Sequence, residues 1–223
     1  MRSPRTAAAF AVLLSTLALA ACTGDQDPPP DNAEQVLADA ADAMADLRTV
    51  RLRVQADTDL AELPVRRVEA QVTRTGDAAG TAQVEQFGQL VEVAFVVVGD
   101  DFHYQVLGGW QKGSRAEAAA LYDPSAILDP DRGVAHLLRT LTDARVEGED
   151  EVAGVRTWRV TGGLAREAVA TLLPGAPEGV TGTLWIGVER PLLHRVRVEL
   201  PDGAGPVTVD LFDHDAPADI REP

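Results

Sequence analysis

Cysteine, lysine and aromatic residues are scarce in this 223-residue sequence. The chain has one cysteine, Cys22, and one lysine, Lys112, and aromatic residues make up only 4% of it. A single cysteine excludes an intramolecular disulfide, so the thiol must be buried filler, a nucleophile or an attachment point. Since hydrophobic residues reach 45%, the interior must consist mainly of valine, leucine and alanine. Such an interior is harder to fill to native density than one with many rings, and it therefore permits an internal cavity.

Positive charge is also in short supply. The chain has 20 basic and 35 acidic residues, which gives a formal net charge of −15. Nucleic acids and anionic lipid headgroups both attract clustered lysine and arginine, so the composition argues against either as the main partner. We interpret the acidity as a solubility feature of an exported domain.

The first residues have the pattern of an export signal. Arg2 and Arg5 precede an uncharged apolar run, which is shorter than the roughly 20 residues of a membrane-spanning helix. Leu19-Ala20-Ala21-Cys22 then resembles the bacterial lipobox, in which the cysteine thiol receives a lipid and becomes the new N-terminus. This predicts a signal peptide over 1–21 and a lipid anchor at Cys22. The alternative is an ordinary secretory signal with a cysteine nearby by chance.

The remaining chain divides into a short tether and one domain. Residues 22–31 are polar, acidic and rich in proline, which favours an extended linker. Residues 32–223 show no repeat and no internal linker. We expect one α+β domain with an antiparallel sheet and helices packed on one face of it.

The element pattern predicts a first helix, then strands, a central helical insert and strands again. Asp31 and Glu34 suggest a capping box for a first helix at about 32–47, and Ser114 with Glu117 suggests a second. Asp129 and the following proline predict the N-cap and first turn of a further helix. Alternating apolar residues predict strands at 49–56, 68–74, 182–188, 192–200 and 205–212, two or three strands within 79–106, and a hairpin through Gly154. Apolar residues at helical spacing predict a short helix within 164–175.

Several motifs together resemble a known family. They are Ala120–Gly162, which begins Ala-Leu-Tyr-Asp-Pro, then Thr181–Leu200 with its Leu-Trp-Ile strand, and the C-terminal residues from Val207. With the lipobox, they resemble the LppX/LprA/LprF/LprG family of cell-envelope lipoproteins from mycobacteria and related actinobacteria, closest to the LprG branch. The resemblance covers nearly the whole chain after the signal peptide.

The resemblance implies a strongly curved antiparallel half-barrel, with helices on its concave face around an apolar cavity. It implies that the cavity takes acyl chains of phospholipids, triacylglycerols or glycolipids such as lipoglycans, and that the protein carries them across the cell envelope. It further implies that the lipid on Cys22 holds the protein at the outer face of the cell membrane, and that the protein functions together with a major-facilitator-type exporter. No cofactor is expected.

Candidate lipid-binding residues are the inward-facing members of the expected sheet and helix. Ala82 is of special interest because its small side chain leaves room that a bulky substitution would fill. The alternative for every candidate is ordinary core packing. The candidates are Ala82, Val84, Val91, Val93 and Phe95 from the sheet, and Val134, Leu137, Leu138 and Leu141 from the helix.

Catalytic and metal-binding motifs are not evident in the sequence. It lacks a Gly-x-Ser-x-Gly elbow, a phosphate loop and a His-Glu-x-x-His helix, and its four histidines are scattered. We therefore expect no catalytic and no metal site. Two other functions remain open: an envelope interaction or assembly module without lipid cargo, and a hydrolase or transferase, which would need a cluster of polar groups in the pocket.

Overall fold

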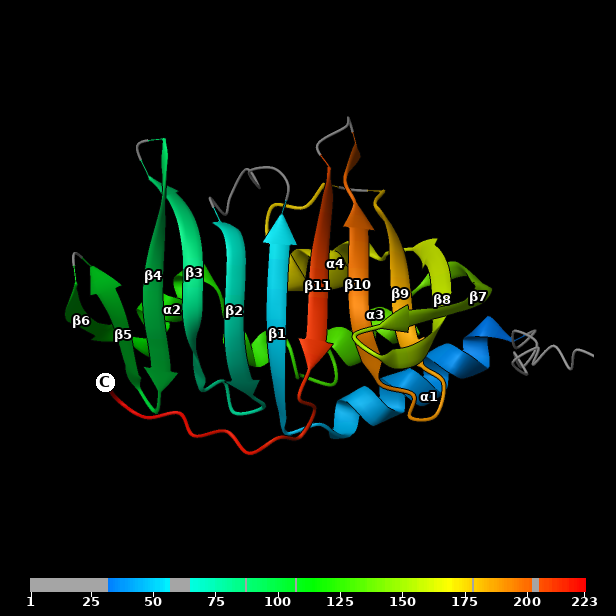
Figure 1. The fold of residues 1–223 in the computed structure, drawn as a ribbon, viewed down its shortest axis with the longest axis horizontal. Coiled ribbons are helices and arrows are strands. Elements are labelled where there is room, and N and C mark those ends of the chain that lie inside the picture. Colours follow the sequence, from blue (N-terminus) through cyan, green and yellow to red (C-terminus); the bar gives the residue numbers. More distant parts are fainter. Residues whose placement is uncertain (1–31, 57–64, 87, 107, 178, 202–204) are drawn as a thin grey trace, which may run out of the picture.

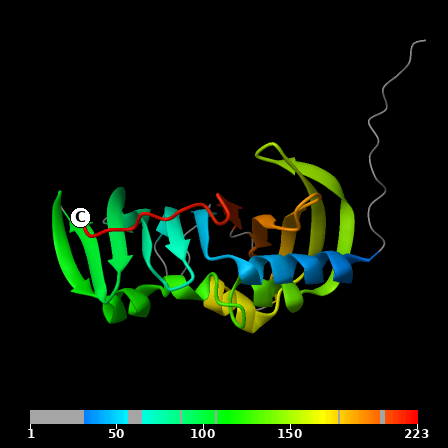
Figure 2. The same ribbon diagram turned by 90° about the horizontal axis from the view of Figure 1, so that it is seen from below.

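The described part of the protein is built on one large sheet. A computed structural model describes residues 32–56, 65–86, 88–106, 108–177, 179–201 and 205–223, so the signal peptide, Cys22, the tether and Asp31 lie outside the described residues. Its eleven antiparallel strands follow the order β6-β5-β4-β3-β2-β1-β11-β10-β9-β8-β7. The sheet is curved and unclosed, and the helices lie along one face (Figures 1 and 2). This confirms the expected α+β fold class.

The sheet consists of two runs of consecutive hairpins joined in the middle. The join is the pairing of β1 with β11, in which Leu52 lies opposite Leu211. The strands of the first run are β1 (Thr49–Ala56), β2 (Val65–Thr73), β3 (Ala78–Gln86), β4 (Gln89–Val98), β5 (Asp101–Val106) and β6 (Gly109–Ser114); those of the second are β7 (Thr142–Val152), β8 (Val155–Gly163), β9 (Thr181–Gly187), β10 (Leu193–Glu199) and β11 (Pro206–Phe212).

Local turn chemistry fixes the hairpins. Between β7 and β8, Ala153 and Gly154 both have positive φ, at 50° and 82°. Two consecutive residues with positive φ form the turn whose twist matches that of antiparallel strands. The hairpin expected at Gly154 is therefore confirmed.

Among the described residues, four α-helices and the 3-10 helix η1 form the layer beside the sheet. They are α1 (Ala33–Asp46), α2 (Arg115–Leu121), η1 (Pro124–Ala126), α3 (Val134–Arg139) and α4 (Arg166–Leu172). Within the described ranges, none of them combines the length and the apolar character that crossing a membrane would need. The capping box at Ser114 and Glu117 is confirmed, since Ser114 N–H donates to Glu117 Oε2 and Glu117 N–H donates to Ser114 Oγ.

Two predicted helix starts differ from the structure. The N-cap of α1 is Asn32, whose side chain accepts a hydrogen bond from Gln35 N–H at 3.2 Å. Asp129 does not cap α3: its Oδ1 accepts from Asp131 N–H and Arg132 N–H, which closes a turn before the helix. The helix begins only after Gly133, because residues 129–132 are used by that turn.

The two halves of the sheet are covered differently. Under the second run, α1 packs against α3, and the core there is solid: Met44, Leu138, Leu184 and Ile186 are at most 1% exposed. No residue of α1 lies on the wall of the hollow, which is covered by the first run together with β10 and β11. The position of α1 therefore decides where the sheet has a packed interior and where it has an open one.

Candidate functional site

A large apolar cavity lies between the sheet and the helix layer. Its volume is about 780 Å³, near the upper end of the roughly 300–1,000 Å³ of small-molecule sites. Among the described residues of its wall, the polar ones are Tyr104, Lys112, Glu117 and Tyr122, and the Lys112 ammonium pairs with Asp101 on the outer face. A wall of this kind suits apolar ligands, because water finds few polar partners along it.

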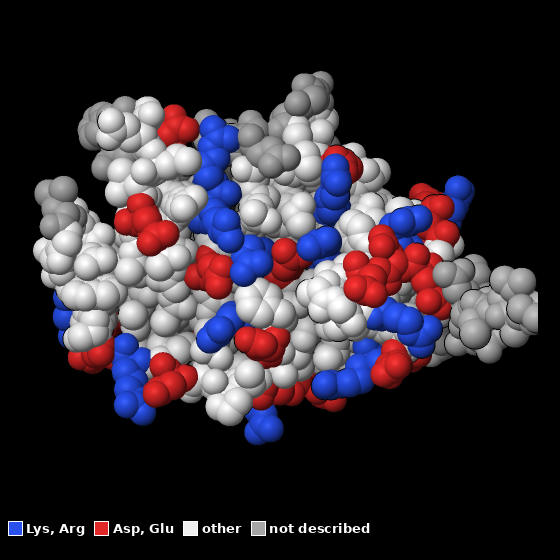
Figure 3. All heavy atoms as spheres, viewed as in Figure 1, with Lys and Arg blue, Asp and Glu red and all other residues white. Residues whose placement is uncertain are grey.

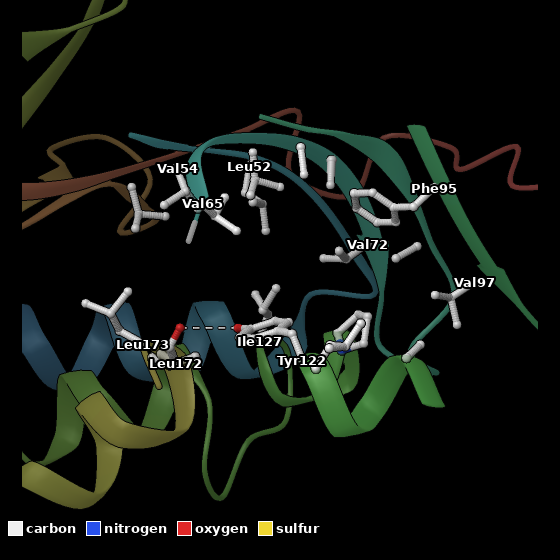
Figure 4. Close-up of a pocket in the computed structure, with 18 of the residues that line it drawn as sticks. Leu52, Val54, Val65, Val72, Phe95, Val97, Tyr122, Ile127, Leu172 and Leu173 are labelled. Carbon is white, nitrogen blue, oxygen red and sulfur yellow. Dashed lines mark hydrogen bonds between the residues drawn. The ribbon is translucent and has the colours of Figure 1, made fainter. Parts of the chain in front are cut away.

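The roof of the cavity is made by alternate residues of β1 to β5, β10 and β11. Because successive side chains of a strand point to opposite faces, one face of each strand enters the cavity. Figure 4 shows Leu52, Val54, Val72 and Phe95 pointing from the strands toward the helices. Valine, which has a short side chain, is the commonest residue in this wall.

The floor is made by α2, η1, α3, α4 and the segments that join them. Ile127, Leu172 and Leu173 point up from the floor toward the strands (Figure 4). Tyr122, at the end of α2, donates its hydroxyl hydrogen bond to the carbonyl oxygen of Leu172 at 3.4 Å. This contact joins α2 to α4 across the floor.

Tyr122 stays neutral under all ordinary conditions. Burial raises the pKa of its phenol well above the usual value, and the nearby negative charge of Asp123 raises it further. The hydroxyl therefore remains a hydrogen-bond donor and adds no charge to the apolar wall.

The Tyr-Asp-Pro motif holds the floor in shape. Asp123 Oδ1 accepts from Ser125 N–H at 3.0 Å, and Arg132 Nη2 donates to Asp123 Oδ2 at 3.2 Å. Arg132 Nε also donates to Asp129 Oδ2 at 2.8 Å. Partial burial raises the pKa of Asp123, but hydrogen bonds from Ser125 and Arg132 outweigh it and hold the pKa below its usual value. The charged network thus fixes the segment that carries Ile127 into the cavity.

Gly133 completes this floor because no other residue fits there. A Cβ at this position would lie 2.3 Å from the carbonyl oxygen of Ala126 and 2.5 Å from that of Ile127. Gly133 N–H donates to Asp129 O at 2.8 Å, and Val134 N–H donates to Ile127 O at 3.1 Å. The chain therefore folds tightly onto itself just before α3.

The structure places six of the nine candidate residues on the cavity wall and three elsewhere. Val91 lies near the start of β4, is 39% exposed and is not part of the wall. Leu138 is 1% exposed in the solid core, and Leu141 lies past the end of α3, with its Cγ 2.8 Å from the Cβ position of Gly162. The six on the wall are Ala82, Val84, Val93, Phe95, Val134 and Leu137.

Sequence reasoning did not name the larger part of the wall. Residues from β1 and β2 such as Leu52 and Val72 had the same alternating signal but were not singled out. Tyr122, Leu172 and Leu173 carried no such signal, because α2 and α4 are each seven residues long. Only their position opposite the sheet identifies them.

The outer face of the sheet is charged, whereas the face that lines the cavity is apolar. Figure 3 shows acidic and basic side chains mixed across it. Arg53 pairs with Glu69 at 3.0 Å and Arg195 Nε donates to Asp210 Oδ1 at 2.6 Å, each across neighbouring strands. The alternating arginines of β10 therefore belong to the solvated face.

The fold and the cavity define a half-barrel protein with an apolar space under a curved antiparallel sheet. The family model of the LppX_LprAFG lipoproteins matches residues 32–220, and the chain belongs to this family. The resemblance seen in the sequence is therefore confirmed.

Individual relatives agree with this assignment. The chain is 32% identical to the lipoarabinomannan carrier protein LprG of Mycolicibacterium hassiacum, over all of this chain and 99% of that one. It is 30% identical to lipoprotein LprA of Mycobacterium tuberculosis, over 93% and 92% of the two chains. The crystal structure of LprF from Mycobacterium bovis superposes with a TM-score of 0.77 at 27% identity, covering 87% of this chain and 98% of that one.

Proposed function

We propose that this protein is a membrane-anchored lipoprotein that binds acyl chains of lipids or glycolipids in its cavity and transfers them across the cell envelope. The observation that carries the proposal is the apolar cavity of about 780 Å³. An acyl chain in water costs about 0.8 kcal/mol for each exposed methylene, and an enclosed apolar wall removes that cost without any chemistry. A binding role needs no catalytic group, and we propose none.

Acylated glycolipids are the cargo class we favour. A relative at 32% identity is named a lipoarabinomannan carrier, and a carrier of such a molecule must shield acyl chains while its sugars stay in water. The described cavity wall suits the acyl chains of a glycolipid, since the wall has few polar groups. We propose that Ala82, Val84, Val93, Phe95, Val134 and Leu137 contact the chains.

The anchor and the setting complete the proposal. A lipid on Cys22 would hold the domain at the outer face of the cell membrane, with residues 22–31 as a tether and 32–223 as the binding domain. Two acyl chains give firm attachment where one gives only marginal binding. Delivery to or from a major-facilitator-type exporter is the partner relation we propose.

Native mass spectrometry with lipid extraction tests the binding role. The chain from Thr23 onward, which lacks Cys22, is placed behind a cleavable secretory signal and produced in an actinobacterial host so that physiological lipids are available. We expect a folded protein that retains a lipid with several acyl chains. A well-folded protein that is free of lipid from such a host would contradict the proposal, and a co-purifying protein partner would then favour an assembly module.

A further inference from the structure

The C-terminal residues cross the outer face of the sheet. After β11, Asp215 N–H donates to Thr49 O at 2.9 Å and Thr49 Oγ1 donates to Ala216 O at 2.6 Å. Gln71 Nε2 then donates to Pro217 O at 3.2 Å. The segment continues past the ends of β1 to β4 and ends beside β5 (Figures 1 and 2). It therefore spans from the middle of the sheet toward the edge.

Three metal-ligating side chains meet where this segment ends. Asp101 and His103 are two residues apart on β5, so both point to the outer face, while Phe102 and Tyr104 face the cavity. Glu222 comes from the C-terminal segment. One ligand atom from each of the three residues lies within 4.8 Å of the others.

The histidine has an unmet hydrogen-bonding group. His103 is 8% exposed, and its Nε2 is buried without a hydrogen-bond partner among the described residues. A buried polar atom left without a partner costs about 1–3 kcal/mol, so such atoms are rare without a reason. A neutral imidazole nitrogen is also the commonest protein ligand for transition metals.

The donor atoms of the cluster suit a divalent cation, and its two carboxylates outnumber the one ammonium group, Lys112, beside them. Asp101 and Glu222 supply two carboxylates, and Lys112 Nζ donates to Asp101 Oδ2 at 2.8 Å, which leaves the other oxygen of Asp101 for a ligand bond. Histidine with two carboxylates is a donor set for Zn²⁺, with metal–ligand distances of about 2.0–2.2 Å and water in the open position. Tetrahedral ligands at such distances lie roughly 3.4 Å apart, so a small side-chain movement closes the site.

We propose that Asp101, His103 and Glu222 form a binding site for a divalent transition-metal ion that fastens the C-terminal segment to β5. The site lies on the outer face, opposite the cavity wall, and it does not depend on the proposed lipid binding. Two strand residues and one distant residue supply the ligands, so the metal links parts of the chain about 120 residues apart in sequence.

Isothermal titration of the full chain with Zn²⁺ tests the site. The protein is purified in detergent, treated with a chelator and dialysed before the titration. We expect one Zn²⁺ per chain and a Kd at least tenfold weaker in Glu222→Gln. Glu222 is exposed, so this substitution leaves the fold intact. Asp219→Asn, in the same segment but outside the cluster, is the matched control and should bind as the unaltered chain does.

A second variant and a second readout complete the test. His103→Gln should also weaken Zn²⁺ binding at least tenfold, and Zn²⁺ should raise the Tm of the unaltered chain but not of either variant. Absence of Zn²⁺ binding, or binding that Glu222→Gln leaves unchanged, overturns the proposal. If His103→Gln fails to fold, the comparison of Glu222→Gln with Asp219→Asn decides alone.

Discussion

Substitution of Ala82 by tryptophan should block the cavity without disturbing the sheet. Ala82 lies in β3 between Val68 of β2 and Val93 of β4, and its side chain is on the cavity wall. Because the space in front of it is empty, a large ring there meets no packed neighbour. Thr81 is one residue away on the opposite, outer face, beside Glu69. Thr81→Trp is therefore a matched control.

The size of the effect follows from the methylene groups that the ring displaces. If the indole excludes four methylenes of an acyl chain, the loss is about 3 kcal/mol at about 0.8 kcal/mol each. This corresponds to an increase in Kd of roughly 200-fold. A longer displaced stretch would increase the loss in proportion.

Fluorescence titration with a pyrene-labelled acyl chain measures this change, and circular dichroism and Tm establish that both variants are folded. We expect binding to fall in Ala82→Trp and to remain in Thr81→Trp. A folded Ala82→Trp protein that binds the probe as tightly as the unaltered chain would refute the assignment of the cavity as the binding site. Equal losses in both variants would indicate an effect on the sheet rather than on the cavity.

Three further predictions concern stability, measured by urea unfolding. Gly133→Ala should cost more than about 2 kcal/mol because its Cβ would collide with three carbonyl oxygens. Gly109→Ala, whose Cβ meets only one atom at 3.8 Å, should be nearly neutral, and equal costs would contradict the tight turn. Leu184→Ala in the solid half should cost about 2–5 kcal/mol because it leaves a void in a packed region. Val84→Ala on the cavity wall should cost under about 1 kcal/mol because the space beside it is already open, and similar costs for the two would mean that the cavity is filled by packing. Burial, and then the charges of neighbouring His214 and Arg190, lower the pKa of the His194 imidazole to about 4. The unfolded chain therefore binds a proton at this imidazole more readily than the folded chain does, and the free energy of unfolding should fall as the pH drops from about 6.5 to about 4. For a half-buried ring the loss is about 1–2 kcal/mol after solvent screening, and His194→Gln should flatten that part of the pH profile; an unchanged profile would refute the assignment.

Much of the fold was predictable because it depends on local signals. Strand alternation in β1, β2 and β10, the cap formed by Ser114 and Glu117, and the turn at Gly154 each depend on residues close in sequence. The motif from Tyr122 onward, through its resemblance, added the curved sheet and the helices on its concave face. Where local signals were weak they misled: Asp129 closes a turn instead of capping α3, and β6, with the sequence Gly-Trp-Gln-Lys-Gly-Ser, was not foreseen.

Only the tertiary structure decided what each apolar face meets. Alternation identifies the inward side of a strand, but it does not say whether a helix packs against that side or leaves it open. Leu137 and Leu138 are neighbours in one helix with the same apolar character, yet the first lines the cavity and the second lies in the solid core. The pairing of Leu52 with Leu211 and the path of Glu222 to β5 likewise join residues more than 100 positions apart. The sequence by itself determined which residues favour burial, and the placement of the helices determined where those residues pack tightly and where they surround a space.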